Sequence, residues 1–233
     1  MRRITCLLAS VALSTFAVAE SPAPRTDRVL TQVEQQSLTP NQVLERLSGG
    51  NSRFVNGDLT TRNHSSLVRD AAAGQAPKAM ILSCIDSRVP VEDIFDQGIG
   101  DLFVARVAGN IENTDILGSI EFATQVSGAK LIVVLGHESC GAIRAAIDNV
   151  QLGNITALLE NIKPAVEALS DYPGEQTSSN PEFVHLVAEK NVELTMQNIL
   201  DKSPIVAEMV ESGEVSIVGG VYDLHSGEVE LLN

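Results

Sequence analysis

The chain has 233 residues, of which 44% are hydrophobic and 20% are charged, and its 30 acidic and 16 basic side chains give a net charge of −14. This composition supports a folded core and excludes a disordered or fibrous chain. The negative charge makes nucleic acids and anionic membranes poor partners, and a chain with no Trp, six Phe and two Tyr offers few rings for stacking on bases. Three Cys are too few for a disulfide scaffold.

The first residues have the features of a secretory signal peptide. Arg2 and Arg3 precede an apolar run over 4–19 that ends in Ala17-Val18-Ala19, which is the order of a charged region, an apolar region and a cleavage site. The alternative is a membrane anchor, which needs about 20 apolar residues, whereas this shorter run contains four hydroxyl side chains. We therefore expect residues 1–19 to be removed, the protein to be periplasmic or otherwise exported, and no membrane contact to remain after cleavage.

Strands and helices are then expected to alternate along the chain. Residues 20–39 are polar and are expected to form a mobile leader, and a helix is expected to start at Pro40. Short apolar segments predict buried strands at 78–85, 101–108 and 130–136, and helical periodicity predicts helices at 114–127 and 139–150. Strands without polar alternation, interleaved with helices, are typical of a parallel sheet that is covered on both faces.

The C-terminal part is expected to be mostly helical and to close with a strand. Helical segments follow from Thr156 with a kink at Pro164, and a Pro/Gly/Ser-rich loop at 171–181 leads into a long helix at 182–201. Segments 214–224 and 228–232 flank the turn Ser226-Gly227 and predict a closing edge strand or hairpin. We interpret residues 40–233 as one α/β domain, with a mostly parallel central sheet flanked by helices.

After removal of residues 1–19, two Cys are left in the chain, and they lie with one His where predicted strands end. Cys84 closes the strand at 78–85, and His137 and Cys140 follow the strand at 130–136 in the pattern H-x-x-C. Ligand-binding groups of a parallel sheet gather at the carboxyl ends of its strands. Two thiolates and one imidazole suit zinc with a fourth position open, and Cys140 would gain from the first turn of a helix capped by Ser139. The alternatives are a disulfide between Cys84 and Cys140 and two unrelated buried thiols.

An acidic and a basic side chain follow the first Cys. Asp86 and Arg88 lie two and four residues after Cys84. Asp86 is close enough in sequence to reach a metal or its water, and Arg88 can hold the carboxylate through two parallel hydrogen bonds. The alternative is a solvated ion pair in a loop, worth at most about 1 kcal/mol.

These residues lie in motifs that identify a known family. The segments are CIDSRVP (84–90), GDLFVARVAGN (100–110), SIEFA (119–123) and VVLGHESCGAI (133–143). The chain resembles the β-class carbonic anhydrases, in an exported, bacterial-type form, over about residues 40–225. The resemblance implies one Zn²⁺ per chain and reversible hydration of carbon dioxide to bicarbonate and a proton by hydroxide held on that zinc.

The resemblance also assigns roles to residues of the site. It implies that Cys84, His137 and Cys140 bind zinc and that Asp86 and Arg88 are catalytic, with Asp86 a fourth metal ligand only if the site closes. Because Ile81 stands where family members that close the site carry Trp, we expect Arg88 to hold Asp86 off the zinc. The residues that the family resemblance places in contact with substrate are Gln75, Phe103, Ala108, Phe122 and Gly141.

Several points remain open from the sequence. The protein could instead be a related hydrolase of carbon disulfide or carbonyl sulfide, or a non-catalytic module held by zinc or a disulfide. The resemblance implies a homodimer or homotetramer with N-terminal helices packed across the interface. Glu138 could tune the zinc site or face solvent, and we favour solvent. His64, His185 and His225 are candidates for proton transfer, although a surface or core role is expected for each.

Overall fold

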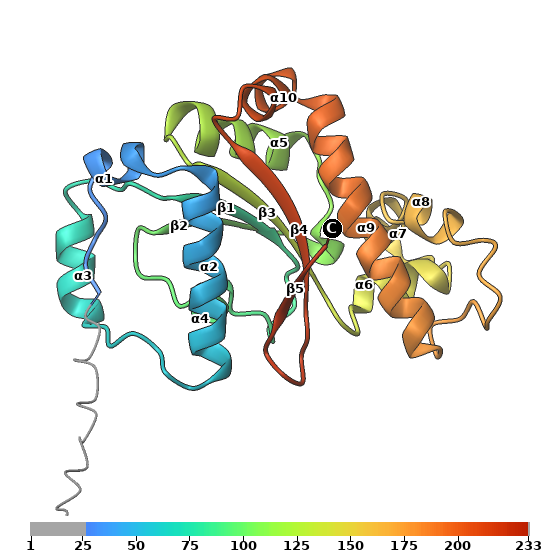
Figure 1. The fold of residues 1–233 in the computed structure, drawn as a ribbon. Helices are drawn as coiled ribbons and strands as arrows, with labels where there is room; N and C mark the ends of the chain where they lie inside the picture. The colour runs from blue at the N-terminus through green and yellow to red at the C-terminus, as the bar shows by residue number, and fades with distance from the viewer. Residues whose placement is uncertain (1–26, 233) are drawn as a thin grey trace, which may run out of the picture.

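A five-stranded sheet lies at the centre of the fold in the order β2-β1-β3-β4-β5 (Figure 1). The computed structural model describes residues 27–232, so the expected signal peptide 1–19 and residues 20–26 of the expected leader lie outside the described residues. The strands are β1 (Ala79–Ser83), β2 (Leu102–Arg106), β3 (Leu131–His137), β4 (Ser216–Tyr222) and β5 (Val229–Leu231). The first four are mutually parallel, and β5 pairs antiparallel with β4. The predicted parallel sheet with a closing hairpin is confirmed.

Two layers of helices cover the sheet. The helices before the third strand are α1 (Gln32–Ser37), α2 (Pro40–Val55), α3 (His64–Ala71), α4 (Val91–Ile94), the short η1 (Ala108–Asn110), α5 (Thr114–Glu121) and η2 (Phe122–Val126). Those after it are α6 (Gly141–Ile147), α7 (Gly153–Leu159), α8 (Lys163–Glu167), α9 (Pro181–Lys202) and α10 (Pro204–Glu211). None of the described helices is both long and apolar enough to cross a bilayer.

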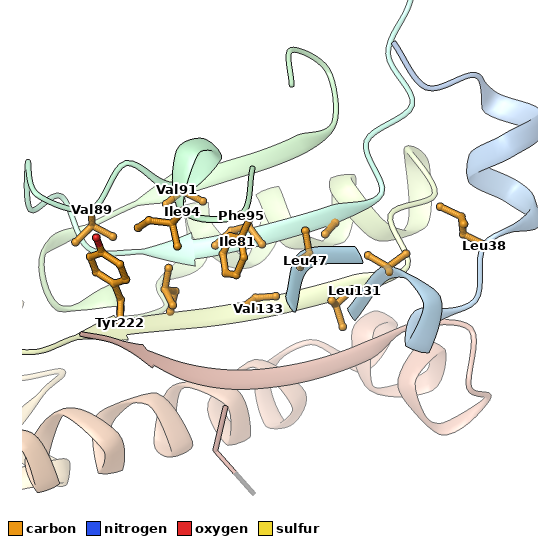
Figure 2. Packing of buried hydrophobic residues seen from close by; sticks show 13 residues of the cluster. Leu38, Leu47, Ile81, Val89, Val91, Ile94, Phe95, Leu131, Val133 and Tyr222 are labelled. Atoms are coloured by element: carbon orange, nitrogen blue, oxygen red, sulfur yellow. The ribbon is translucent and has the colours of Figure 1, made fainter. Parts of the chain in front are cut away.

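Alternate residues of the buried strands face opposite layers. Ile81 and Val133 pack with residues of α2 and α4, such as Leu47 and Ile94 (Figure 2). Met80 and the other residues of opposite parity pack under α5, α9 and α10. The burial of β1 and β3 on both faces explains why their sequences lack polar alternation.

A third apolar cluster extends beyond the carboxyl end of the sheet. It joins Cys84 and Cys140 to apolar residues of α6, α8 and α9, including Ala165 and Phe183. The ends of β1 and β3 therefore lie against a packed helical lobe, which restricts the access of water to the two thiols.

Three elements differ from the sequence-based expectation. The segment expected to be a mobile leader contains α1, which starts at a capping box between Thr31 and Glu34 and buries Gln35. The helix predicted at 114–127 is α-helical only to Glu121 and continues as the π-helical turn η2. The helix predicted from Ser139 begins at Gly141, because Ser139 has a left-handed φ of 52° and Cys140 is the N-cap.

Candidate zinc site

Three side chains converge at the carboxyl edge of the sheet. Cys84 follows β1, His137 is the last residue of β3, and Cys140 caps α6. Because β1 and β3 are adjacent and parallel, both end at the same edge. One potential ligand atom from each of the three residues lies within 4.8 Å of the other two. The side chains are buried, with His137 fully inaccessible.

The two thiols have the separation that one metal ion requires. Both cysteines are free, and their Sγ atoms are 3.9 Å apart. Two thiolates at about 2.3 Å from a tetrahedral zinc ion lie roughly 3.8 Å from each other. The sequence left a disulfide open as an alternative, but the structure has unlinked thiols at metal-ligand spacing.

The orientation of His137 supplies the third ligand. Its Nδ1 lies 2.8 Å from the backbone carbonyl oxygen of Glu138, so Nδ1 carries the proton and donates it to that oxygen. The lone pair is then on Nε2, which is buried and has no hydrogen-bond partner. A buried polar atom without a partner is costly, and a metal ligand needs this tautomer held in this way. The three side chains therefore fit zinc.

The protonation of the two thiols also favours a cation. The hydrogen bond from Cys140 lowers the pKa of Cys84, and the backbone N–H of Gly109, 3.4 Å from the Cys84 Sγ, acts in the same direction. Hydrogen bonding to Cys84 and burial raise the pKa of the Cys140 thiol. One negative charge is thus accommodated without a metal, and a second requires the positive charge of a bound ion.

Asp86 is held beside the ligand cluster by Arg88. Oδ1 of Asp86 accepts from the backbone N–H of Arg88 at 3.0 Å and from its Nε at 2.9 Å, and Oδ2 accepts from Nη2 at 2.7 Å. These hydrogen bonds keep the pKa of Asp86 well below its usual range. Oδ2 also lies 3.9 Å from Nε2 of His137, so an ionised carboxylate stands at the edge of the cluster.

The backbone around the cluster is fixed by residues that sequence reasoning missed. Arg106 donates to the carbonyl oxygens of Cys84, at 2.8 Å, and of Asp86. Asn191 of α9 is buried and donates to the carbonyl oxygen of Gly109 at 2.8 Å, which holds the loop whose N–H meets Cys84. In the sequence, the role of Asn191 is indicated only by its position as a polar residue on the otherwise apolar face of a long predicted helix.

The five expected substrate contacts separate into two groups. Ala108 begins η1 beside Gly109, and Gly141 follows Cys140 with open space where a Cβ would stand, so both adjoin the cluster. Phe103 and Phe122 instead form an edge-to-face pair, with ring centroids 6.2 Å apart, in a groove on β2 and α5 that no cluster residue lines. Gln75 is exposed before β1 begins, at the amino end of the sheet. Phe103, Phe122 and Gln75 therefore lie away from the Cys-His-Cys cluster of their own chain.

Comparison with known proteins agrees with this geometry. A family model described as carbonic anhydrase matches residues 79–229. "Carbonic anhydrase 2" of Mycobacterium tuberculosis is 38% identical over 201 residues, which cover 84% of this chain and 94% of that protein. A carbonic anhydrase of Pseudomonas aeruginosa is 33% identical over 175 residues, which cover 72% and 79% of the two chains.

Solved structures show the same fold. A β-carbonic anhydrase of Aspergillus fumigatus superimposes with a TM-score of 0.65 at 27% identity, over 83% of this chain and 90% of that chain. A tetrameric β-carbonic anhydrase of Sordaria macrospora gives 0.64 at 27% identity, over 83% and 98%. With its Cys-His-Cys cluster at the carboxyl edge of a parallel sheet, the chain belongs to the β-class carbonic anhydrases.

Proposed function

We propose that the protein catalyses the reversible hydration of carbon dioxide to bicarbonate and a proton, with one zinc ion held by Cys84, His137 and Cys140. The observation that carries this proposal is the buried Nε2 of His137, which has no hydrogen-bond partner and faces two free thiols. Three protein ligands leave a fourth coordination position for the reaction, as in catalytic rather than structural zinc sites.

A zinc ion held by these three residues would lower the pKa of a water molecule at the fourth position to about 7, the value known for carbonic anhydrases that use three His ligands. Asp86 has a carboxylate oxygen 3.9 Å from Nε2 of His137, and it would accept a hydrogen bond from the attacking water and so fix the direction of the lone pair of that water. Arg88 donates a hydrogen bond to each oxygen of Asp86, and these bonds keep the carboxylate ionised and in place. The fully buried His137 and the apolar lobe behind the thiols limit competing water.

We propose that the active unit is a homodimer, alone or paired into a homotetramer. Within the described chain β2 pairs only with β1 and is an edge strand, and Phe122 beside it is 51% exposed. In such a dimer Phe103, Phe122 and Gln75 of one copy would line the substrate pocket of the other. This arrangement accounts for their distance from the cluster of their own chain, and the tetrameric relative of Sordaria macrospora supports association of this kind.

We propose further that the protein is exported after cleavage at Ala19. The support is the order of charged, apolar and small residues over 1–19. N-terminal sequencing of the protein from fractionated cells should give a chain that starts at or near Glu20 in the exported fraction. An intact Met1 in the cytoplasmic fraction would contradict export.

The test of the activity combines metal analysis with stopped-flow hydration of carbon dioxide by the purified protein. We expect about one zinc per chain and rapid hydration, and we expect Cys84→Ser to lose both together because a thiolate ligand is removed. Full zinc without hydration would overturn the proposal, and hydrolysis of carbonyl sulfide or carbon disulfide by the same sample would then identify the sulfur-specific alternative. A Cys84→Ser variant with full zinc and full rate would overturn the ligand assignment.

A further inference from the structure

We infer that Arg106, at the carboxyl end of β2, is a positioning residue that holds the carboxylate of Asp86 in place through the backbone. This inference rests on the proposed function, because the carbonic anhydrase reaction is what gives Asp86 its role. Arg88 holds the side chain of Asp86 through two hydrogen bonds. Because Arg88 belongs to the same loop, the Asp86–Arg88 pair can shift as one body unless the loop is anchored to another element.

The guanidinium of Arg106 provides that anchor from β2. Its Nε donates to the carbonyl oxygen of Cys84 at 2.8 Å, and its Nη2 donates to the carbonyl oxygen of Asp86. The donors of a guanidinium are planar and have a fixed spacing, so the two bonds together set both the distance and the direction of the loop relative to β2. The backbone on both sides of Ile85 is thereby tied to a strand of the sheet.

The register of the sheet places Arg106 beside this loop. Arg106 pairs with Ser83, the last residue of β1, so its side chain starts where the loop leaves the sheet. Side chains alternate along a strand, and Arg106 therefore shares a face with Val104, which packs against the apolar cluster that contains Val89. The loop after β1 crosses the same face, which brings its carbonyl oxygens within reach of Arg106.

The loop is a tight turn, and its position decides where the carboxylate stands. The backbone N–H of Val89 donates to the carbonyl oxygen of Asp86 at 3.1 Å, and the N–H of Arg88 donates to Oδ1 of Asp86 at 3.0 Å. Oδ2 of Asp86 lies 3.9 Å from Nε2 of His137, so a shift of the turn moves the carboxylate relative to the zinc ligands. A displacement of about 1 Å at a reaction centre can lower a rate about 100-fold.

Two other charged side chains near the ligands make different contacts. Glu138 does not simply face solvent, as the sequence led us to expect, because its side chain is about two-thirds buried and Oε1 lies 3.8 Å from Nδ1 of His185 in α9. Nη2 of Arg144 lies 3.5 Å from Oγ of Ser139. Both contacts involve the turn after β3, whereas Arg106 supports the loop that follows β1.

The test is a double-mutant cycle between Arg106→Met and Asp86→Asn, measured by stopped-flow hydration of carbon dioxide with zinc-loaded proteins. Arg106→Met alone should keep about one zinc per chain and lower kcat roughly ten-fold. In the Asp86→Asn background the same change should lower kcat less than about two-fold, because the carboxylate that Arg106 positions is already gone. Arg69→Met is the matched control and should equal the wild type. Arg69 is exposed near the end of α3, whose last residue Ala71 lies beside Gly100 at the amino end of the sheet.

A second measurement follows the loop without using activity. Hydrogen exchange of the peptide 84–90 in zinc-loaded Arg106→Met should be roughly ten-fold faster than in the wild type. The reason is that the N–H groups of Arg88 and Val89 bond to Asp86 within a turn that has lost its anchor. Arg106→Lys keeps the charge but cannot donate at two fixed points, and it should show the same faster exchange.

The outcomes separate this inference from the proposed function. An unchanged kcat of Arg106→Met, or an equal loss in both backgrounds, would overturn it, because Arg106 would then not act through Asp86. Unchanged exchange at 84–90 or a full rate in Arg106→Lys would overturn it as well, and loss of zinc from Arg106→Met would show support of the ligands instead. A zinc-loaded wild type without hydration activity would refute the proposed function itself, while faster exchange in Arg106→Met would still show the hold on the loop.

Discussion

Replacement of Asn191 should weaken zinc binding although this side chain does not contact the ligands. Asn191 is 2% exposed, and among the described residues the hydrogen bond of its side chain is the one that Nδ2 donates to the carbonyl oxygen of Gly109. The backbone N–H of Gly109 in turn donates a hydrogen bond to Sγ of Cys84. Asn191→Leu keeps the number of side-chain heavy atoms and removes the donor, and Asn191→Ala also removes packing atoms. Both variants leave a buried carbonyl without a partner.

The magnitude follows from this single bond. A buried carbonyl that loses its donor costs about 1–3 kcal/mol, and a cost near 2 kcal/mol corresponds to a fall in Tm of roughly 4–8 °C for a chain of this size. Loss of a residue that orients a metal ligand lowers metal affinity by about 10- to 100-fold. We therefore expect Asn191→Leu to show both effects, and Asn191→Ala to be somewhat less stable still.

The assay pairs thermal unfolding of the zinc-loaded protein with zinc competition against a chelator. The control is Asn161→Ala, because Asn161 is exposed and its side chain donates to the carbonyl oxygens of Ala157 and Leu158 in its own helical segment, each at 3.1 Å. That change should shift stability by less than about 0.5 kcal/mol. If both Asn191 variants match the control in Tm and in zinc affinity, the reasoning that Asn191 supports the Cys84 loop is refuted.

Three further predictions concern the site and its assembly. Asp86→Asn should retain zinc but lose about 100-fold or more in kcat, because the carboxylate orients water without holding the metal; loss of zinc measured by elemental analysis would make Asp86 a permanent ligand instead. Since Arg88 lowers the pKa of Asp86, the stability gained from its ionised form is present above the ordinary pKa of about 3.9 and is lost only as pH falls through the lowered pKa. The pH–rate profile should therefore follow a single ionisation near pH 7, and a slope well above one on the acid side would contradict an Asp86 held off the metal. Phe122→Arg should place a charge on the exposed edge beside β2 and yield a zinc-loaded, poorly active monomer in sedimentation experiments, whereas an unchanged oligomer with unchanged rate would exclude this surface from the interface.

The local sequence determined the sheet and the ligand set. Unbroken apolar segments such as 130–136 form stable strands only when both of their faces are buried. These segments alternate along the chain with segments of helical periodicity, which leaves few topologies besides a parallel sheet. The ligands lie within a few residues of strand ends, so the parallel direction of the strands already placed Cys84, His137 and Cys140 on one edge. Asp86 and Arg88 are two residues apart, and their pairing is equally local.

The tertiary structure decided what depends on contacts between distant segments. The tautomer of His137 and the free state of the thiols follow from atom positions that no spacing specifies. The support of Gly109 by Asn191 joins residues 82 positions apart, and it requires α9 to pack against η1. Gln75 lies at the amino end of the sheet, opposite the carboxyl edge that holds the cluster. Phe103 and Phe122 lie in the groove beside the edge strand β2, away from the ends of β1 and β3. Sequence resemblance names the residues of a site, and the packed chain shows which of those residues one copy of the protein brings together.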